Sequence, residues 1–341
     1  MGNPPNEFQS LKILMVLLRG CVSAPQFCIV HLASLPLVPC GDDMQVLAVG
    51  HCTLDYLAVV DRFPEPESKK DMLQFSQQGG GSAATAAVTL ARWGVSTGFV
   101  GKAADDGRGH EIVRTIRDEG VNVDHFVFQK GAVSQLSFIV IEQGTGRKQT
   151  YVTPGNVDVL RANEIPDEVL DGVTWLLVDG THIEAELDLM KRAKERGIRI
   201  LLDAQSLTPA IAEAVAHCDV LVASERFASQ FAGVGELTSL CRTLLDKGPS
   251  HVVVTLGVDG CVALDRDTDK LVRLEAFDVP VVDTTGAGDV FHGAVLYGLL
   301  NGFSLREQVE FANIAAGLAC QGVGGRGAIP SLEEVRKHFS S

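Results

Sequence analysis

From residue 44 onward, short runs of β-branched residues alternate with longer segments in which apolar residues recur at helical spacing. This alternation is typical of parallel strands, because each helix carries the chain back to the edge where the next strand begins. The sequence therefore predicts an α/β fold with a mainly parallel sheet covered by helices on both faces. The expected strands are residues 46–49, 97–100, 175–178, 198–202, 220–222, 252–256 and 261–264, the last two forming a hairpin. The expected helices are residues 83–93, 109–119, 185–196, 209–216, 237–246, 290–300, 305–320 and 332–339.

Two segments break this alternation. Residues 55–78 and 132–153 carry extended patterns with no helix inside them. In the second segment Leu136, Phe138 and Val140 mark one apolar face, since alternate residues of a strand point to the same side. We expect antiparallel strands that project from the main sheet. Because no internal repeat or low-complexity linker divides the chain, one domain is expected.

The first 43 residues do not resemble the rest of the chain. Their apolar stretch at 11–18 is far shorter than the roughly 20 residues that span a bilayer. Met44 directly precedes the first expected strand, so the favoured interpretation is that the protein begins there and residues 1–43 are a mis-called start. The alternative is a targeting peptide, with Lys12 before the apolar stretch and Ala24 near a cleavage point.

The charge balance argues against nucleic acid as the main partner. The formal net charge is −14, whereas binding to a phosphate backbone needs a basic surface. A single nucleotide is still compatible with this charge, because local amides and a metal ion can hold its phosphates. None of the 8 cysteines forms a C-x-x-C pair, and several lie in apolar runs. We therefore expect reduced thiols in a cytoplasmic protein that does not bind membranes.

Residues 283–289 combine two features that phosphoryl transfer requires. Gly286, Ala287 and Gly288 have little or no side chain, so their backbone N–H groups can converge on an anion. The apolar run that follows indicates a helix whose N-terminus, with about +0.5 charge, supports that anion. Asp289 stands between turn and helix, where a carboxylate would repel a phosphate. It is a candidate general base for an attacking hydroxyl, and the alternative is an N-cap of the helix.

This stretch closely resembles the C-terminal signature of the ribokinase-like (PfkB) sugar kinases, and the resemblance of the whole chain covers about residues 44–335. It implies a three-layer α/β/α sandwich in which Asp289 is the catalytic base and the amides of residues 286–289 form the anion hole. It also implies ATP as the phosphoryl donor and Mg²⁺ as cofactor. The two extended segments correspond to a β-lid that covers the sugar and often serves as a dimer face, so a homodimer through the lid is expected.

A second glycine-rich turn, at residues 79–87, reads Gly-Gly-Gly-Ser-Ala-Ala-Thr-Ala-Ala and matches the family's N-terminal signature. Glycines at a strand-to-helix junction let a ligand approach the backbone, and the alanines favour the helix. A threonine stands where most family members carry an asparagine that holds sugar hydroxyls. An aspartate just past the first strand is assigned to two adjacent hydroxyls, although an exposed loop residue is the alternative. The expected substrate-binding residues are Asp55, Gly80, Gly81, Ser82 and Thr85.

A third glycine turn follows the strand at 252–256 and, by the resemblance, lies along ATP, although a plain hairpin turn is the alternative. A small-residue helix near the C-terminus resembles the one on the adenine side. The expected ATP-binding residues are Thr255, Gly257, Gly260, Asn313 and Gly325.

The glycine-rich loop at 322–327, paired with Asp283 and Thr285, matches the region where many family members bind a monovalent cation, commonly potassium. Arg326 in this loop either stays in solvent or touches a phosphate or an acidic substrate.

The magnesium motif departs from the family pattern. Members usually carry Asn-x-x-Glu after a late strand, which orders Mg²⁺ through water. The equivalent residues 224–227 read Ser-Glu-Arg-Phe, so Glu225 is the remaining candidate as an outer-sphere ligand. Magnesium is still expected, because the charge of ATP needs neutralising.

Two departures from the family pattern are the threonine in place of the asparagine and the altered magnesium motif. Both resemble the branch of the family that contains 6-deoxy-6-sulfofructose kinase, with ketohexokinase-like enzymes as neighbours. A sulfonate tail needs cations. Lys69 lies in the first lid segment, and Arg147 and Lys148 lie in the second, so Lys69 and Lys148 are candidate substrate ligands. Taken singly, each also fits an ordinary exposed cation.

The sequence is thus interpreted as an ATP-dependent kinase for a primary hydroxyl of a monosaccharide, a ketose such as fructose or sulfofructose. One alternative is a nucleoside kinase on the same fold, which needs an aromatic lid to stack a base. Another is a non-catalytic sugar or nucleotide sensor. A dinucleotide-dependent dehydrogenase is disfavoured, because no G-x-G-x-x-G follows the first strand.

Overall fold

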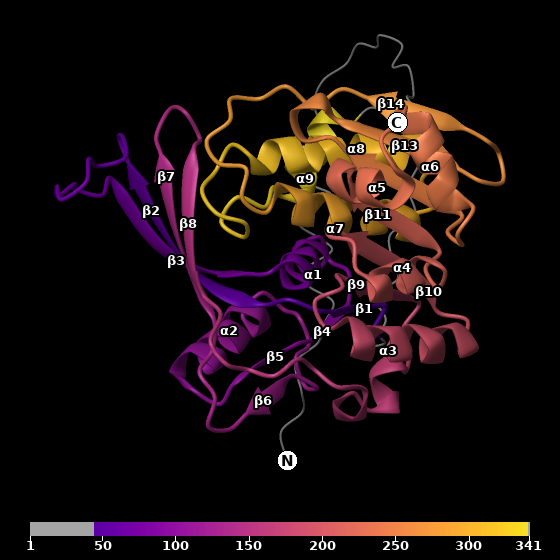
Figure 1. Cartoon of the computed structure of the whole chain (residues 1–341), viewed down its shortest axis with the longest axis horizontal. Coiled ribbons are helices and arrows are strands. Elements are labelled where there is room, and N and C mark those ends of the chain that lie inside the picture. The colour runs from indigo at the N-terminus through magenta and orange to yellow at the C-terminus, as the bar shows by residue number, and fades with distance from the viewer. Residues whose placement is uncertain (1–43, 340–341) are drawn as a thin grey trace, which may run out of the picture. The chain divides into compact units, whose positions relative to one another are not determined.

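The computed structural model describes residues 44–339, and the interpretations made for residues 1–43 lie outside this range. Its main sheet has the strand order β14-β13-β12-β11-β10-β9-β1-β4 (Figure 1). From β12 to β4 in this order, neighbouring strands run parallel. At the other edge, β13 pairs antiparallel with β12, and β14 pairs antiparallel with β13. The strands are β1 (Val46–Val49), β4 (Thr97–Val100), β9 (Trp175–Val178), β10 (Arg199–Ala204), β11 (Val220–Ser224), β12 (His251–Thr255), β13 (Cys261–Asp265) and β14 (Leu271–Leu274).

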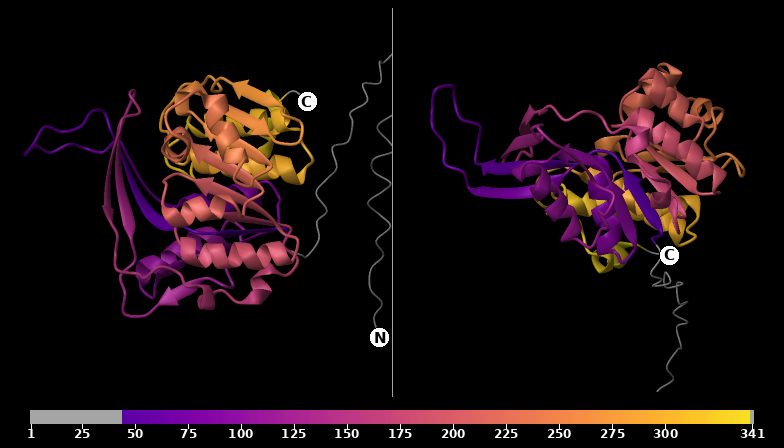
Figure 2. Two further views of the ribbon diagram at one scale, coloured as in Figure 1. Left: turned by 45° about the vertical axis from the view of Figure 1, so that its right-hand side comes forward. Right: turned by 90° about the horizontal axis from the view of Figure 1, so that it is seen from below.

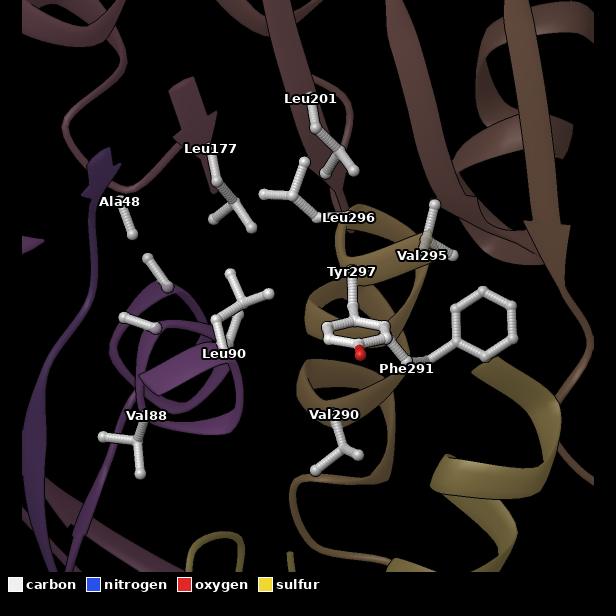
Figure 3. Packing of buried hydrophobic residues seen from close by; sticks show 14 of the residues in the cluster. Ala48, Val88, Leu90, Leu177, Leu201, Val290, Phe291, Val295, Leu296 and Tyr297 are labelled. Carbon is white, nitrogen blue, oxygen red and sulfur yellow. The ribbon is translucent and has the colours of Figure 1, made fainter. Parts of the chain in front are cut away.

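Helices cover both faces of this sheet, which confirms the predicted layers. Alternate residues of each strand contribute to two separate cores, as the pleat of a doubly covered sheet requires. On one face Leu296 lies beside Leu177 and Leu201 of the sheet (Figure 3). The helices on that face are α1 (Ser82–Arg92), α2 (Gly107–Arg117), α7 (Ala287–Leu300), α8 (Leu305–Ala319) and α9 (Leu332–His338). Those on the other face are α3 (Ile183–Glu195), α4 (Pro209–Val215), α5 (Glu225–Ala232) and α6 (Leu237–Leu245).

A second sheet, with the order β3-β2-β7-β8, stands beside the main one (Figures 1 and 2). Its strands are β2 (Thr53–Val60), β3 (Gln74–Gly80), β7 (Leu136–Glu142) and β8 (Lys148–Thr153). The prediction of antiparallel strands is correct for the two hairpins but wrong for the central pair, since β2 and β7 run parallel. The two central strands are the first strands of their hairpins and run in the same direction, so their pairing is parallel. A short pair, β5 (Lys102–Ala104) and β6 (Val127–Gln129), lies below it.

The two faces of the small sheet differ in chemistry. Leu57, Ile139 and Ile141 point towards the α/β body, where they pack against Val323. The predicted apolar face at residues 136, 138 and 140 is the outer face, where Phe138 pairs with Tyr151 and Tyr56. Phe75 stacks on Tyr56, and both Phe75 and Tyr151 are more than half exposed. The inner face therefore packs against the α/β body, and the outer face presents aromatic residues to solvent.

Two differences from the predicted elements bear on function. Helix α7 begins at Ala287 instead of residue 290, because Gly286 adopts a left-handed φ of 76° and caps it. Helix α5 was not predicted, since its first turn was interpreted as a magnesium motif. No helix within residues 44–339 is long and apolar enough to cross a membrane.

Candidate active site

The anion loop, residues 283–289, leads directly into α7. No side chain of the described residues caps the start of this helix. The N–H of Ala287 makes a long contact, 3.4 Å, with the carbonyl oxygen of Thr284, whereas those of Gly288 and Asp289 have no partner among the described residues and can bind an anion. A Cβ on Gly286 would lie 2.4 Å from the Cα of Gly325, and the φ of Gly286 is positive, so only glycine fits there. Asp289 is the third residue of α7, and the interpretation of Asp289 as an N-cap is therefore wrong.

Asp289 is half-buried, and its protonation is set by its surroundings. Burial raises the pKa of its carboxyl to about 6, and the negative charge of Asp203 adds to the rise, while His292 opposes it. A carboxylate with a pKa near neutrality can accept a proton from an alcohol and release it again. The predicted base therefore has the properties that the role requires.

A cavity of about 440 Å³ lies on one side of the anion loop. It brings together four of the five residues predicted to bind ATP with Ala287 and Gly288 of the loop, and its volume is in the range of small-molecule sites. The four are Thr255, Gly257, Gly260 and Asn313. Gly325 does not line this cavity and packs on Gly286 instead. Phe277 and Phe291 give the cavity apolar walls that suit a planar base.

Asp283 organises the anion loop. Its Oδ1 accepts hydrogen bonds from the amide and the hydroxyl of Thr285, at 3.0 and 2.8 Å, and its Oδ2 accepts one from the amide of Gly324, at 2.9 Å. The carboxylate is 1% exposed. It therefore ties the two glycine-rich loops together, whether or not a cation also binds nearby.

Glu225 is the exposed first residue of α5 and follows the end of β11. Ser224 pairs in register with Thr255 of the nucleotide cavity, so Glu225 lies at the same edge of the sheet. Among residues 44–339, no three His, Cys, Asp or Glu side chains form a group that could hold a metal ion.

The other side of the anion loop carries polar atoms without partners. Asp55 is 7% exposed and Thr85 is 1% exposed, yet neither Oδ1 of Asp55 nor Oγ1 of Thr85 has a hydrogen-bond partner in the part of the chain that the structure describes. Buried polar atoms are nearly always paired, so two such atoms in one region indicate a ligand site. Gly80 and Gly81 line the same turn. A Cβ on Gly81, whose φ is 97°, would lie 2.3 Å from the carbonyl oxygen of His51.

The predicted cations lie in different places. Lys148, on β8, donates a hydrogen bond of 3.0 Å to Oγ1 of Thr285 and so reaches the anion loop from the small sheet. Lys69 is exposed in the loop between β2 and β3, which extends away from the α/β body (Figures 1 and 2). Ser82 accepts a hydrogen bond from Gln205 at 3.3 Å.

Arg326 is 3% exposed, so the interpretation that it stays in solvent is wrong. Its guanidinium donates to the carbonyl oxygen of Gly80 at 2.8 Å and to Oγ1 of Thr115 at 3.1 Å. Burial lowers the pKa of this group to about 10, although the carboxylate of Asp55 favours its charged form. Arg326 thus connects the C-terminal loop to the sugar-side turn.

A smaller cavity of about 150 Å³ was not predicted from the sequence. His51 and Cys52, which adjoin Gly81, form one wall, and Lys102, Gln135 and His182 form others. Nδ1 of His182 accepts the amide N–H of Leu160, so its Nε2 carries the hydrogen. No local pattern marks these residues, because they come from segments far apart in the chain.

Comparison with known proteins agrees with this geometry. Residues 43–332 match the sequence model of the pfkB family of carbohydrate kinases. The chain belongs to this family. A 5-dehydro-2-deoxygluconokinase of Geobacillus thermodenitrificans is 27% identical over 316 residues, covering 86% of this chain and 92% of that protein. A ketohexokinase of Mus musculus is 25% identical over 290 residues, covering 82% of this chain and 97% of that protein.

Solved structures place this pfkB kinase in the ribokinase-like fold. A putative ribokinase from Agrobacterium tumefaciens superposes with a TM-score of 0.79 and is 27% identical, covering 87% of this chain and 97% of that one. A putative ribokinase II from E. coli, solved with ATP and Mg²⁺, superposes with a TM-score of 0.75 and is 19% identical, covering 86% of this chain and 98% of that one. The predicted family, fold and sugar-kinase activity are thereby confirmed. The roles of individual residues remain predictions.

Proposed function

We propose that this pfkB kinase transfers the γ-phosphoryl group of ATP to a primary hydroxyl of a ketose-like monosaccharide, with Asp289 as general base. One observation carries the proposal. The residue next to Asp289, Gly288, lines the nucleotide cavity, while the carboxyl of Asp289 is close enough to Asp55 and Asp203 to be affected by their charges. The base therefore lies between a nucleotide site and a polar pocket.

Each group has a definite part in the transfer. Asp289 accepts the hydroxyl proton as the sugar oxygen forms its bond to phosphorus and the bond to the β-phosphate oxygen breaks. The free amides at the start of α7 stabilise the charge on the transferred group. Asp55 and Thr85, with their unpartnered oxygens, hold other sugar hydroxyls. Packing of the small sheet over this side excludes water, which would otherwise accept the phosphoryl group.

Metal ions complete the proposal. Mg²⁺ neutralises the phosphates of ATP, and Glu225, at the edge of the nucleotide cavity, would hold it through water. A potassium site near Asp283 and Thr285 is retained as a proposal, with backbone carbonyls of the anion loop and the 322–327 loop as its ligands.

The small cavity supports a substrate that is longer than its reacting end. His51 and Lys102 present cations or donors, and His182 presents an N–H. Lys102 is already paired with Glu164, at 2.8 Å, so the pocket is polar and not strongly basic. It would take the far hydroxyl or acidic end of the sugar. Lys69 and Lys148 are retained as further candidate ligands for an anionic tail.

The outer face of the small sheet supports a dimer of two copies. Phe75 and Tyr151, both on this face, are exposed to 54% and 58%. A cluster of exposed aromatic residues on a short sheet is typical of a contact surface. Charged substitutions at Phe75 and Tyr151 would then convert a dimer to a monomer in sedimentation, and an unchanged sedimentation coefficient would contradict the lid as the dimer face.

The test of function is ADP formation by the full chain with Mg²⁺, with and without K⁺. The acceptor panel contains fructose, sulfofructose, tagatose, ribose, adenosine, 2-keto-3-deoxygluconate and 5-dehydro-2-deoxygluconate. A single preferred ketose or acidic keto sugar is expected. Preference for adenosine would favour the nucleoside kinase. If no acceptor gives ADP although ATP still binds, the sensor is favoured.

Asp289→Asn tests the base directly. We expect kcat to fall by about 10²–10⁴-fold, the usual contribution of a general base. At pH 7 the variant should unfold at a temperature no lower than the parent, because burial disfavours the charged carboxylate that Asn removes. Asp267→Asn, at an exposed turn, is the control. Near-parental turnover of Asp289→Asn would refute the assignment.

A further inference from the structure

We propose that His292 is a protonated positioning residue whose ion pair with Asp203 keeps Asp289 in its reactive, ionised form. This inference rests on the proposed role of Asp289 as base. Neither residue stands out in the sequence, because they come from distant elements, α7 and β10.

The geometry of the imidazole indicates its charge. Nε2 of His292 lies 3.1 Å from Oδ1 of Asp203, and Nδ1 contacts the carbonyl oxygen of Gly288. His292 is 6% exposed and Asp203 is 2% exposed. The carbonyl oxygen of Gly288 can only accept, so Nδ1 carries hydrogen. Nε2 and Oδ1 of Asp203 lie at ion-pair distance without hydrogen-bond geometry, and neither atom has a hydrogen-bond partner among residues 44–339. A lone pair on Nε2 would face the carboxylate unfavourably, which favours an imidazolium between the anion loop and the sheet.

The surroundings explain why a cation is needed there. Acidic side chains converge on this region, namely Asp289 on α7, Asp203 on β10, Asp179 after β9, Asp55 on β2 and Glu186 on α3. Burial by itself lowers the pKa of His292, but Asp203, Asp289 and the carbonyl oxygen of Gly288 together outweigh burial, and the pKa rises to about 9. Without the imidazolium, the uncompensated charge of Asp203 would oppose ionisation of Asp289.

Other elements packed on α7 do not supply this cation. Helices α1 and α8 both contact α7. The charged residue of α1, Arg92, pairs with Glu119 at 2.6 Å. The charged residues of α8 lie in its first two turns. These turns pack against the C-terminal end of α7, where Gly298 approaches Gln308 of α8. His292 lies at the opposite end, one turn after Asp289.

The pair also extends towards the sugar side. Oδ2 of Asp203 accepts a hydrogen bond from Nε2 of Gln205 at 3.1 Å, and the same nitrogen donates to Oγ of Ser82 at 3.3 Å. Ser82 is the first residue of α1, directly after the glycine turn. One chain of polar contacts thus joins the catalytic helix to the turn expected to hold the sugar.

The experiment compares the pH dependence of kcat in three variants of the full chain. His292→Gln leaves the charge of Asp203 uncompensated, so the acid limb of the profile should move up by about one pH unit. Asp203→Asn removes the charge that raises the pKa of Asp289, so it should move the limb down. The double variant should return it towards the parental position, while KM for the sugar stays within about threefold. A role in packing alone predicts no opposite shifts and no restoration.

The ring can also be observed without activity. Nitrogen NMR of the parental protein should show His292 protonated at both nitrogens at pH 7, and a neutral ring would overturn the proposal even if the variants fail to fold. An unmoved acid limb in a folded His292→Gln protein would overturn it as well. These failures differ from those of the proposed function, which falls if no sugar of the panel is phosphorylated or if Asp289→Asn stays active.

Discussion

Lys148, on the edge strand of the small sheet, donates a hydrogen bond of 3.0 Å to Oγ1 of Thr285 in the anion loop. The same hydroxyl donates to Asp283, at 2.8 Å. The small sheet is thus joined by a cation to the loop proposed to bind the transferred phosphoryl group. We therefore predict that the position of this sheet and the formation of the anion site are coupled.

Lys148→Met should therefore impair the chemical step. We expect kcat to fall by about tenfold, because a positive charge near the transferred group is lost. Steady-state kinetics with both substrates varied would measure the change. Lys194→Met, at an exposed position on α3, is the matched control. A kcat within twofold of the parent would contradict the coupling, and a change confined to KM for the sugar would assign Lys148 to the substrate tail.

The activity should depend on the ionisation of Asp289. Its pKa is raised to about 6, and the ionised form is the base. Turnover should be constant above this pH and should fall as the pH drops through about 6, approaching tenfold per unit. The profile of kcat between pH 4.5 and 8 measures this. A fall in kcat centred near pH 4 would mean that the carboxylate of Asp289 is not buried in the working enzyme.

Gly286→Ala should disable the anion loop. The added Cβ would meet the Cα of Gly325 at 2.4 Å, in a backbone conformation with a φ of 76°. We expect a loss of about 1–3 kcal/mol in the free energy of unfolding, since such strain must be relieved by moving the loop. Denaturant unfolding measures the loss, and turnover should fall as well. Gly107→Ala is the control, because its Cβ meets nothing within 4 Å and its φ is not positive. Equal stability of the two variants would contradict the close packing.

Arg326→Met should weaken both the fold and the sugar site. The change leaves the carbonyl oxygen of Gly80 without its buried donor and frees the C-terminal loop. A loss of about 2–4 kcal/mol in the free energy of unfolding is expected, with a raised KM for the sugar. Arg117→Met, at an exposed position on α2, is the control. If KM for the sugar stays at the parental value in a destabilised protein, Arg326 supports the fold without positioning the turn.

Much of the fold was predictable because its signals are local. The parallel strands appear as short apolar runs, and the helices as periodic segments, so their order along the chain follows from sequence. The start of α7 was placed three residues late, since a glycine in the left-handed region can cap a helix as well as interrupt it. The parallel pairing of β2 and β7 was missed, because pairing between distant strands leaves no mark in either strand alone.

The sequence by itself determined the chemistry of the anion loop. Glycines at 286 and 288, an acid at 289 and an apolar helix are local requirements, and each can be read from neighbouring residues. Only the tertiary structure decided which groups surround that acid. The contact of Asp203 with His292, the burial of Arg326 beneath Gly80 and the approach of Lys148 to Thr285 join residues far apart in the chain. Such contacts depend on packing between elements, and packing sets the electrostatics that make a carboxylate reactive.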